Sequence, residues 1–564
     1  MPFTGLKKIR QSPNPRGKLS VRLLGRIDNA NELLRRFRID PRSTDVALLE
    51  YMYRRHGLVK LLSLCNGPFV IVIDDALSGA FYIARDSQGG QMPCFYLVRS
   101  NTLHYADTIA GLPSQEQIAK ERVAEMLVFG QSMEPILADV KRLHAGTYLA
   151  SIAGKIQVHD YCPWHPKPDK RLTEDDAART LGTLVKQAIN RTHQKLGRSA
   201  ENVFFSGGVD SAMVTQLLRS VMRGEPNIFT SGVVGLGTME SGVSEVMDAD
   251  YATVERLGNE FTFARSLVTS PRRYHEAGFT VQQLLENLKK MVMSLPGGPV
   301  ASTSFPLWAM TSRQAASRSI RFAYTGEGSD EVNAGYATSD PRRYGHRGLL
   351  AGFRALSNHI TYADIRQLMG VDTWCTVIGA ERQNSHLLAR RFGKLDKFNA
   401  IRMFQIQYEL PILIWEKAYG MGAVFGKGLQ FINPYLDYDV MRFMLTVPLH
   451  LCIQQGRRKN VVLNAAAANR VPSVILGRYA SGPRFGKQRT SGPWRHLIYG
   501  DPVFQAFVRS TFRKPLLREL GLCTQRTNLE TFTYSVNRNN PNAHKKVWPL
   551  LILELWLRGY LKSK

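Results

Sequence analysis

The stretch that decides the fold is VFFSGGVDSAMVTQLLRSVM, residues 203–222. It begins with three apolar residues, passes through Ser206, Gly207 and Gly208, and continues with apolar residues at helical spacing. This pattern predicts a buried strand, a glycine turn and a helix. The free N–H groups at the start of such a helix favour an anion, and glycines let a phosphate approach the backbone closely.

Three further side chains define the chemistry of this turn. Ser206 and Ser211 offer hydroxyl donors to a phosphate. Asp210 would repel a bare phosphate but not one that carries Mg²⁺, so the turn indicates a metal-bridged nucleotide. The turn by itself leaves a second interpretation open, in which Asp210 only stabilises the start of the helix.

The segments around this stretch alternate between helical and strand-like patterns. The expected elements are helices over 174–196, 209–222 and 248–261 and strands over 202–205 and 227–235. Alternation of this kind predicts a parallel sheet covered by helices. Beyond about residue 340 the chain has a mainly helical pattern.

The N-terminal part of the chain has a different pattern. Residues 20 to 160 form short strand-like segments with turn residues between them, and one helical stretch covers residues 45–65. With 564 residues the chain is too long for one core. We therefore expect an α+β domain over residues 1–165 and an α/β domain over 171–564, joined by the proline-rich segment CPWHPKPDK at 162–170.

Composition excludes several classes of protein. Hydrophobic residues make up 44% and charged residues 21%, as in ordinary globular proteins. There is no apolar run of 18 residues, so we expect no membrane span, and no apolar segment follows the basic N-terminus as in a secretory signal. The six cysteines form no CxxC pair, which argues against zinc and disulfides and suits a reducing cytoplasm.

The net charge of +28 is large. A basic surface attracts nucleotide phosphates, acidic peptides, nucleic acid or anionic lipid, although a general compositional bias toward arginine gives the same count. The basic residues are spread along the whole chain, without a zinc finger or an aromatic RNA-binding motif. We therefore expect no nucleic-acid partner.

Three segments in order carry a resemblance to a known family. They are SGGVDS (206–211), FAYTGEGSDEVNAGY (322–336) and INPYLDYDVMRFMLTVP (432–448). The first resembles the loop of ATP-pyrophosphatases, and together the three resemble the asparagine synthetase family. The resemblance implies a Rossmann-like domain that binds ATP and Mg²⁺, adenylates a carboxylate and releases pyrophosphate.

The resemblance assigns roles to individual residues. Asp210 and Asp330 match the acids that hold Mg²⁺, and Gly326 lets the backbone pass close to the nucleotide. Glu327 matches a position near the acyl-adenylate, where a glutamate assists attack by the amine; the alternative is a structural acid paired with an arginine. The residues that match the pyrophosphate-binding loop are Ser206, Gly207, Gly208, Asp210 and Ser211.

The family also has a catalytic lysine near the end of this domain. The corresponding segment here is GRYASGPRFGKQRTSGPW, residues 477–494. Arg478 fits the family pattern, but the lysine position two residues later is Ala480. We assign the role to Lys487, which would stabilise charge in the transition state. A neighbouring arginine, or a basic loop without a catalytic role, are the alternatives.

The N-terminal domain resembles class II glutamine amidotransferases, which form an Ntn-type α/β/β/α sandwich. The matching segments are LLGRIDNANELL (23–34), FYIARDSQGGQMPCFYL (81–97) and HAGTYLASIAGKIQVHDY (144–161). Active members begin Met-Cys-Gly and use that cysteine on glutamine, whereas Pro2 stands here and the first cysteine is Cys65. Thr4 would replace it only after removal of three residues. We therefore expect a domain inactive toward glutamine, with a structural or docking role.

A family member without glutaminase takes its amine from elsewhere. β-Lactam, carbapenam and lasso-peptide macrolactam synthetases use an amine within the substrate. The chain length and basic charge favour the lasso type, in which a Glu or Asp side chain of a precursor peptide is adenylated and the peptide's N-terminal amine closes the ring. The resemblance implies a leader-cleaving protease as partner.

Two alternatives remain open. The first is an asparagine synthetase-like or β-lactam synthetase-like ligase that uses ammonia or another small-molecule amine. Glu327 stands where β-lactam synthetases have a tyrosine, which argues against β-lactam formation and keeps the asparagine synthetase-like option open. The second alternative is a non-catalytic adaptor, against which the intact SGGVDS and GEGSD segments count.

Overall fold

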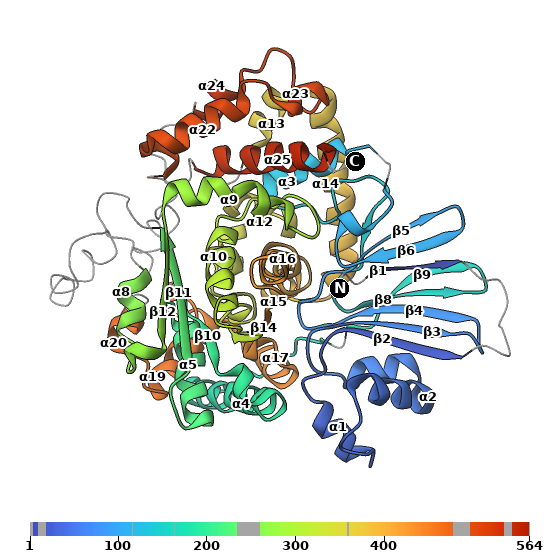
Figure 1. The fold of residues 1–564 in the computed structure, drawn as a ribbon, viewed down its shortest axis with the longest axis vertical. Helices are drawn as coiled ribbons and strands as arrows, with labels where there is room; N and C mark the ends of the chain where they lie inside the picture. The colour runs from blue at the N-terminus through green and yellow to red at the C-terminus, as the bar shows by residue number, and fades with distance from the viewer. Residues whose placement is uncertain are drawn as a thin grey trace.

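The computed structural model describes residues 4–8, 18–114, 117–162, 164–233, 260–357, 360–477, 497–534 and 544–562. Two stacked antiparallel sheets form the N-terminal part, and a parallel sheet between helices forms the larger part (Figure 1). The predicted fold, an α/β/β/α sandwich followed by a Rossmann-like domain with extra helices, is confirmed.

The sandwich consists of two sheets with strand orders β1-β6-β5-β7 and β2-β3-β4-β8-β9. Their strands are β1 (Thr4–Lys8), β2 (Leu19–Gly25), β3 (Phe69–Asp75), β4 (Ala80–Arg85), β5 (Phe95–Arg99), β6 (Thr102–Ala106), β7 (Lys141–Arg142), β8 (Thr147–Ile152) and β9 (Lys155–Asp160). Alternate residues of facing strands point into the space between the sheets, where Val72, Phe81, Ile83, Leu103 and Leu149 form one core.

Helices cover both outer faces of the sandwich. Helices α1 (Ala30–Arg36) and α2 (Asp45–Leu64) pack on β2 and β3, and α3 (Lys120–Phe129) lies on the other side (Figure 1). Thr44 caps α2 by accepting the N–H of Ala47. The helix predicted at 45–65 is therefore present, with a break at Gly57, whose φ is 75°.

The parallel sheet has the strand order β12-β11-β10-β13-β14. Its strands are β10 (Asn202–Phe204), β11 (Asn227–Val233), β12 (Tyr274–Phe279), β13 (Phe322–Tyr324) and β14 (Gln430–Ile432). Numbered along the chain this order is 3-2-1-4-5, so the winding reverses between β10 and β13. Ligands of doubly wound sheets bind at such a reversal, just beyond the carboxyl ends of the strands.

Helices cover this sheet as the alternating sequence predicts. Helix α5 (Val209–Met222) packs on β10 and α4 (Glu174–Leu196), while α10 (Phe305–Ala316) packs on β11. The helices expected at 174–196 and 209–222 thus have the predicted bounds. Most of the helix expected at 248–261 lies outside the described residues, and its last two residues begin α8 (Glu260–Arg265).

The rest of the chain is mainly helical, as expected beyond residue 340. The longer elements are α9 (Val281–Met293), α12 (Leu349–Ser357), α13 (Tyr362–Met369), α14 (Val371–Phe392), α15 (Lys397–Phe404), the π-helix η6 (Gln405–Glu416), α16 (Lys417–Val424), α17 (Tyr438–Met444), α19 (Asn460–Ala468), α22 (Pro502–Phe512), α24 (Leu529–Tyr534) and α25 (His544–Lys562). Shorter ones are η1 (Ile109–Gly111), η2 (Gly197–Ala200), η3 (Pro271–Arg273), α11 (Ser329–Val332), η4 (Ala337–Ser339), η5 (Pro341–Tyr344), η7 (Pro434–Leu436), α18 (Leu449–Cys452), α20 (Ser473–Gly477) and α23 (Leu516–Glu519).

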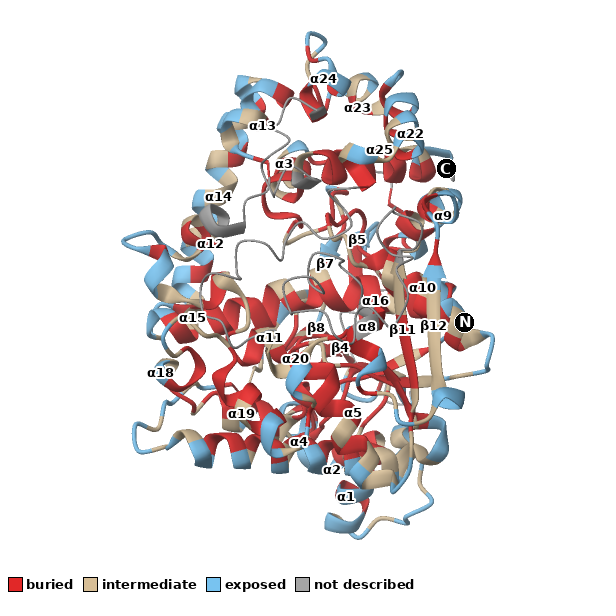
Figure 2. Ribbon diagram, turned by 90° about the vertical axis from the view of Figure 1, so that its left-hand side faces the viewer, coloured by how far each residue is buried: buried red, intermediate tan, exposed pale blue. Residues whose placement is uncertain are grey.

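Burial separates central helices from outer ones. Most residues of α16 and α25 are buried, whereas α14 is largely exposed (Figure 2). Among the described helices, none is long and apolar enough to cross a membrane.

Polar contacts fix the sandwich against the parallel-sheet domain. Arg142 of β7 forms a buried ion pair with Glu416, the last residue of η6. The hydroxyl of Tyr419 donates to Asp107 Oδ2 over 2.6 Å. The proline-rich connection is packed as well, because the indole of Trp164 donates to the carbonyl of Ser87 over 2.6 Å. The two domains therefore share a continuous interface.

Candidate active site

The loop after β10 folds back on the first turn of α5. Gly207 has a φ of 73°, which favours glycine, and Gly208 is the N-cap of α5. The hydroxyl of Ser211 accepts the backbone N–H of Ser206 over 3.3 Å and donates to the carbonyl of Gly208 over 3.2 Å. The loop therefore places two hydroxyls and the start of a 14-residue helix at one spot, as a phosphate site requires.

The loop after β13 contacts the SGGVDS loop at the point where the winding of the sheet reverses. A Cβ added to Gly326 would lie 2.6 Å from the backbone N of Ser211, closer than packed atoms allow. Thr325 Oγ1 accepts the backbone N–H of Glu327 over 3.0 Å and holds the following turn. The two loops can touch only because residue 326 is a glycine.

Asp210 and Asp330 are brought together by a lysine. Nζ of Lys459, the residue before α19, bonds the carboxylate of Asp210 and lies 2.6 Å from Asp330 Oδ1. Ser329 donates its hydroxyl to Asp210 Oδ1 over 2.5 Å. Burial raises the pKa of the Asp210 carboxyl, nearby Lys459 lowers it, and Asp330 raises it further. The result is a cluster of two acids and one cation, in which Asp210 and Lys459 are buried and Asp330 is partly exposed.

The donor set of this cluster fits Mg²⁺. Mg²⁺ in nucleotide sites takes one or two carboxylates and completes its shell with phosphates and water. Asp210 and Asp330 come from the two loops that flank the phosphate site, and the described residues hold no cluster of three or more His, Cys, Asp or Glu that would make an all-protein metal cage. The assignment of Mg²⁺ to these two acids remains a prediction.

Glu327 lies between two buried lysines. Burial raises the pKa of its carboxyl, Lys417 lowers it, Asp330 and Asp210 raise it further, and Lys459 lowers it, with a raised pKa as the net result. Lys417 of α16 is only 3% exposed and donates to the hydroxyl of Ser302 over 3.1 Å and to that of Ser304. Among the described residues, no arginine forms an ion pair with Glu327, and the cations that influence its carboxyl are Lys417 and Lys459.

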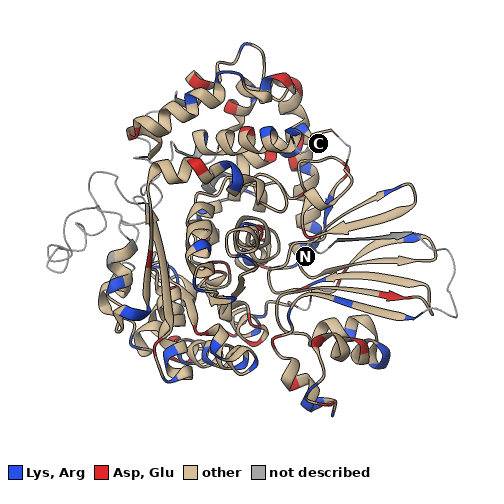
Figure 3. Ribbon diagram, viewed as in Figure 1, with Lys and Arg blue, Asp and Glu red and all other residues tan. Residues whose placement is uncertain are grey.

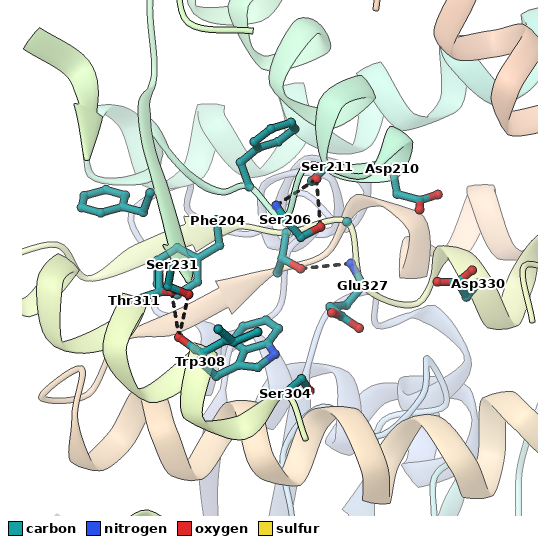
Figure 4. Close-up of a pocket in the computed structure, with 15 residues that line it drawn as sticks. Phe204, Ser206, Asp210, Ser211, Ser231, Ser304, Trp308, Thr311, Glu327 and Asp330 are labelled. Carbon is teal, nitrogen blue, oxygen red and sulfur yellow. Dashed lines mark hydrogen bonds between the residues drawn. The ribbon is translucent and has the colours of Figure 1, made fainter. Parts of the chain in front are cut away.

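A cavity of about 200 Å³ is lined by residues of the SGGVDS loop, of the loop after β13 and of α10 (Figure 4). Phe204, Phe229 and Trp308 line one part, and Ser206, Asp210, Glu327 and Asp330 line another. Between them, Thr311 donates to Ser231 Oγ over 2.7 Å. Aromatic walls suit a flat base, and the polar wall suits phosphates. The lining of the cavity therefore suits part of a nucleotide.

Two family models match this chain. Residues 183–558 match the model for asparagine synthase, and residues 13–162 match the model for the glutamine amidotransferase domain. The chain belongs to the asparagine synthase family. This family consists of ATP-dependent ligases that form amide bonds, and its members use ATP, typically with Mg²⁺.

A curated protein similar to this chain is asparagine synthetase B [glutamine-hydrolyzing] of Escherichia coli (strain K12). The two are 22% identical over 299 residues, which is 52% of this chain and 47% of the relative. The match thus spans about half the length of that protein.

Two solved structures match parts of this chain. One is glutamine phosphoribosylpyrophosphate amidotransferase from B. subtilis complexed with ADP and GMP, with 12% identity, a TM-score of 0.20 and coverage of 44% of this chain and 53% of that one. The other is the allosteric regulatory enzyme of purine biosynthesis, with 13% identity, a TM-score of 0.20 and coverage of 48% and 62%.

Residues 432–448, the third segment that resembles the family, hydrogen-bond to the backbone on both sides of the site. The hydroxyl of Tyr435 donates to the backbone carbonyl of Asp210 over 3.2 Å, and the amide of Asn433 donates to the carbonyl of Glu327. Asp437 forms an ion pair with Arg191 and accepts the amide of Asn66 over 2.8 Å. This segment of the family member positions both loops and contacts the sandwich domain.

The described cysteines of the amidotransferase-like domain are poor nucleophiles. Burial raises the pKa of Cys65, Cys94 and Cys162 to about 12. Attack on glutamine needs a thiolate, which such thiols do not form at neutral pH. Thr4 lies in β1, paired with Ala106 of β6.

Some site residues differ from the sequence-based assignments. Lys487, and with it the whole segment 478–496, lies outside the described residues. Sequence reasoning missed Lys459 and Lys417. Lys459 has one local signal, its position directly before the apolar helix α19, and Lys417 has none within a mostly apolar run.

Proposed function

We propose that this protein is an ATP-dependent carbon–nitrogen ligase that closes a macrolactam in a precursor peptide. A Glu or Asp side chain of the peptide becomes an acyl-adenylate with release of pyrophosphate, and the peptide's N-terminal amine displaces AMP. The observation that supports ligase chemistry is the meeting of the SGGVDS loop, two acids and Lys459 at the reversal of the sheet.

The first step forms a bond between a carboxylate oxygen and the α-phosphorus of ATP and breaks the bond to pyrophosphate. Ser206, Ser211 and the N–H groups of the loop bind the leaving pyrophosphate. Lys459 balances the charge that develops on it. Asp210 and Asp330 would hold Mg²⁺, which supplies further charge neutralisation to the phosphates.

The second step forms the amide bond. The amine attacks the acyl carbon, loses a proton and expels AMP. Glu327 lies in the same cavity as the pyrophosphate-binding loop and is the base available for that proton. Lys417 and Lys459 favour the ionised carboxylate that this role requires. Because the peptide itself supplies the free amine, no ammonia has to be released from glutamine.

Two observations favour an amine carried by the substrate itself. The described cysteines of the sandwich domain have thiol pKa values near 12, which supports an amine source other than glutamine at this domain. Lys and Arg residues are spread over both domains (Figure 3), and the net charge of +28 suits a substrate with an acidic side chain together with ATP. A leader-cleaving protease would supply the free N-terminus.

The test incubates the full chain with ATP, Mg²⁺ and a candidate peptide that has a free N-terminus and an internal Glu or Asp. We expect pyrophosphate release and a product lighter by one water. The same peptide with an acetylated N-terminus should give no ring. Asp210→Ala should lose both products, with Asp372→Asn on the exposed part of α14 as control. No pyrophosphate from the wild type with any peptide or amine would contradict every ligase assignment and leave the adaptor.

A ligase that uses ammonia or another small amine is the second candidate. Glu327 in place of the tyrosine of β-lactam synthetases favours it over β-lactam formation. Growth of an asparagine-requiring strain that expresses this protein would support asparagine synthesis and contradict ring closure.

A further inference from the structure

The hydroxyl of Ser304 has a partner that is unusual for its position in the chain. Ser304 is the N-cap of α10, where a serine hydroxyl ordinarily accepts an N–H group of the first helical turn. In the described part of this chain it forms no such cap bond, and it accepts a hydrogen bond from the ammonium group of Lys417 instead. The hydroxyl therefore does not serve to start the helix.

Two serines and Lys417 form a connected set of hydrogen bonds. Nζ of Lys417 donates to Oγ of Ser302 over 3.1 Å and to Oγ of Ser304, and the two serine oxygens lie 3.0 Å apart. Oγ of Ser302 also accepts the backbone N–H of Ser304 over 3.4 Å. When Ser302 donates to Ser304, the hydroxyl hydrogen of Ser304 is left for a group in the cavity beside the SGGVDS loop, which Ser304 lines.

Ser304 and Glu327 line the same cavity (Figure 4) and are both influenced by Lys417. Burial raises the pKa of the Glu327 carboxyl, and Lys417 is the cation that lowers it most. A base and a hydroxyl donor thus face a common space. Acyl transfer to an amine uses such a pair, because a base takes the proton of the amine and a donor stabilises the oxygen that becomes negative.

On the basis of the ligase chemistry proposed above, on which this inference depends, we propose that Ser304 donates a hydrogen bond to the substrate carboxylate oxygen that does not attack ATP. This oxygen is negative in the free carboxylate. It becomes a carbonyl oxygen when the other oxygen bonds the α-phosphorus and pyrophosphate leaves.

The same oxygen becomes negative again when the amine adds to the acyl carbon. It returns to a carbonyl when the bond to AMP breaks and the proton of the amine passes to Glu327. A single hydroxyl, polarised by the ammonium group of Lys417, can therefore stabilise this oxygen in both steps.

The experiment measures pyrophosphate release by the full chain with ATP and Mg²⁺. The probes are free aspartate, free glutamate and peptides with a free N-terminus and an internal Glu or Asp. We expect Ser304→Ala to lower kcat about 100-fold or more and to leave the KM for ATP unchanged, because a bond made in the transition state is lost. Ser304→Thr keeps a hydroxyl and should recover most of the rate. Ser317→Ala, exposed at the other end of α10, is the matched control.

Two further measurements separate this role from a structural one. Ser302→Ala leaves the bond from Lys417 to Ser304 and should lose less activity than Ser304→Ala. The melting temperature of Ser304→Ala should match that of the wild type, because among the described residues the hydroxyl caps no N–H group of α10.

The outcomes distinguish this role from the ligase assignment. Full activity of Ser304→Ala, a loss that Ser304→Thr does not recover, or a loss that comes with a lower melting temperature would overturn the role of Ser304 and leave the ligase assignment intact. A wild type that releases no pyrophosphate with any probe would contradict the proposed function and this role together.

Discussion

The Nζ atom of Lys459 lies 2.6 Å from Oδ1 of Asp330 and also bonds the carboxylate of Asp210. The two acids lie in the first turns of α5 and α11, which follow β10 and β13 on the two sides of the sheet reversal. The negative charge of Asp330 opposes ionisation of Asp210, and the positive charge of Lys459 offsets this effect. Lys459 thus links the SGGVDS segment to the segment that carries Glu327 and Asp330.

Lys459→Met should lower pyrophosphate release by roughly 100-fold or more, the usual effect of losing one group that stabilises transition-state charge. Lys459→Arg keeps the charge and should retain part of the activity. The measurement is the rate of pyrophosphate release at saturating ATP. Lys289→Met on the exposed side of α9 is the control. Full activity in Lys459→Met would remove this lysine from the mechanism.

Gly326→Ala should abolish activity because the new Cβ would lie 2.6 Å from the backbone N of Ser211 and push the two loops apart. Gly379→Ala, in α14, is the matched control, since a Cβ there meets no atom within 4 Å and alanine favours a helix. Both proteins are compared by pyrophosphate release and by circular dichroism. Equal activity of the two variants would show that the loops do not need this close contact.

The activity should fall on the acid side as Glu327 gains a proton. Burial raises the pKa of this carboxyl, so the loss should begin above the ordinary pKa of about 4.3 for glutamate. Lys417→Met removes a cation that favours the ionised form, so the pKa should rise and the acid limb of the pH–rate profile should move to higher pH. Glu327→Gln should be nearly inactive at every pH. An unmoved acid limb in Lys417→Met would contradict the coupling.

The ion pair between Arg142 and Glu416 is buried on both sides, with 2% of each side chain exposed. Arg142→Met leaves an unpaired buried carboxylate and should destabilise the protein by about 3–5 kcal/mol. The double variant Arg142→Met, Glu416→Met should be more stable than the single one. Thermal denaturation of the three proteins measures this. A double variant less stable than Arg142→Met would show that Glu416 is stabilised by other contacts.

The sequence was sufficient for residues that are close along the chain. The SGGVDS turn predicted β10, the loop and α5, and the helix over 174–196 was found with the same bounds. Period-2 and helical patterns are local, so they survive folding unchanged. The pairing of β10 with β13 was not predicted, because alternation of strands and helices indicates a parallel sheet but does not determine the order of its strands.

The lysines of the site could not be found in this way. Lys459 is one of 74 Lys and Arg residues, and its distance from Asp210 along the chain is 249 residues. Only the folded sheet brings them together. Lys417 lies in a mostly apolar helical run, where a long cationic side chain ordinarily reaches solvent. Its burial becomes evident only when α10 and the residues before it pack against α16.

Three consecutive residues of one helical segment contact three different parts of the molecule. Trp415 lines a cavity of about 590 Å³ between the two domains, Glu416 pairs with Arg142 of the sandwich domain, and Lys417 bonds Ser304, which lines the cavity beside the SGGVDS loop. Deleting the sandwich would expose the carboxylate of Glu416 next to the lysine that acts on Glu327. The sandwich domain therefore forms part of the interior of the neighbouring domain, and this contribution does not depend on any chemistry at a site of its own.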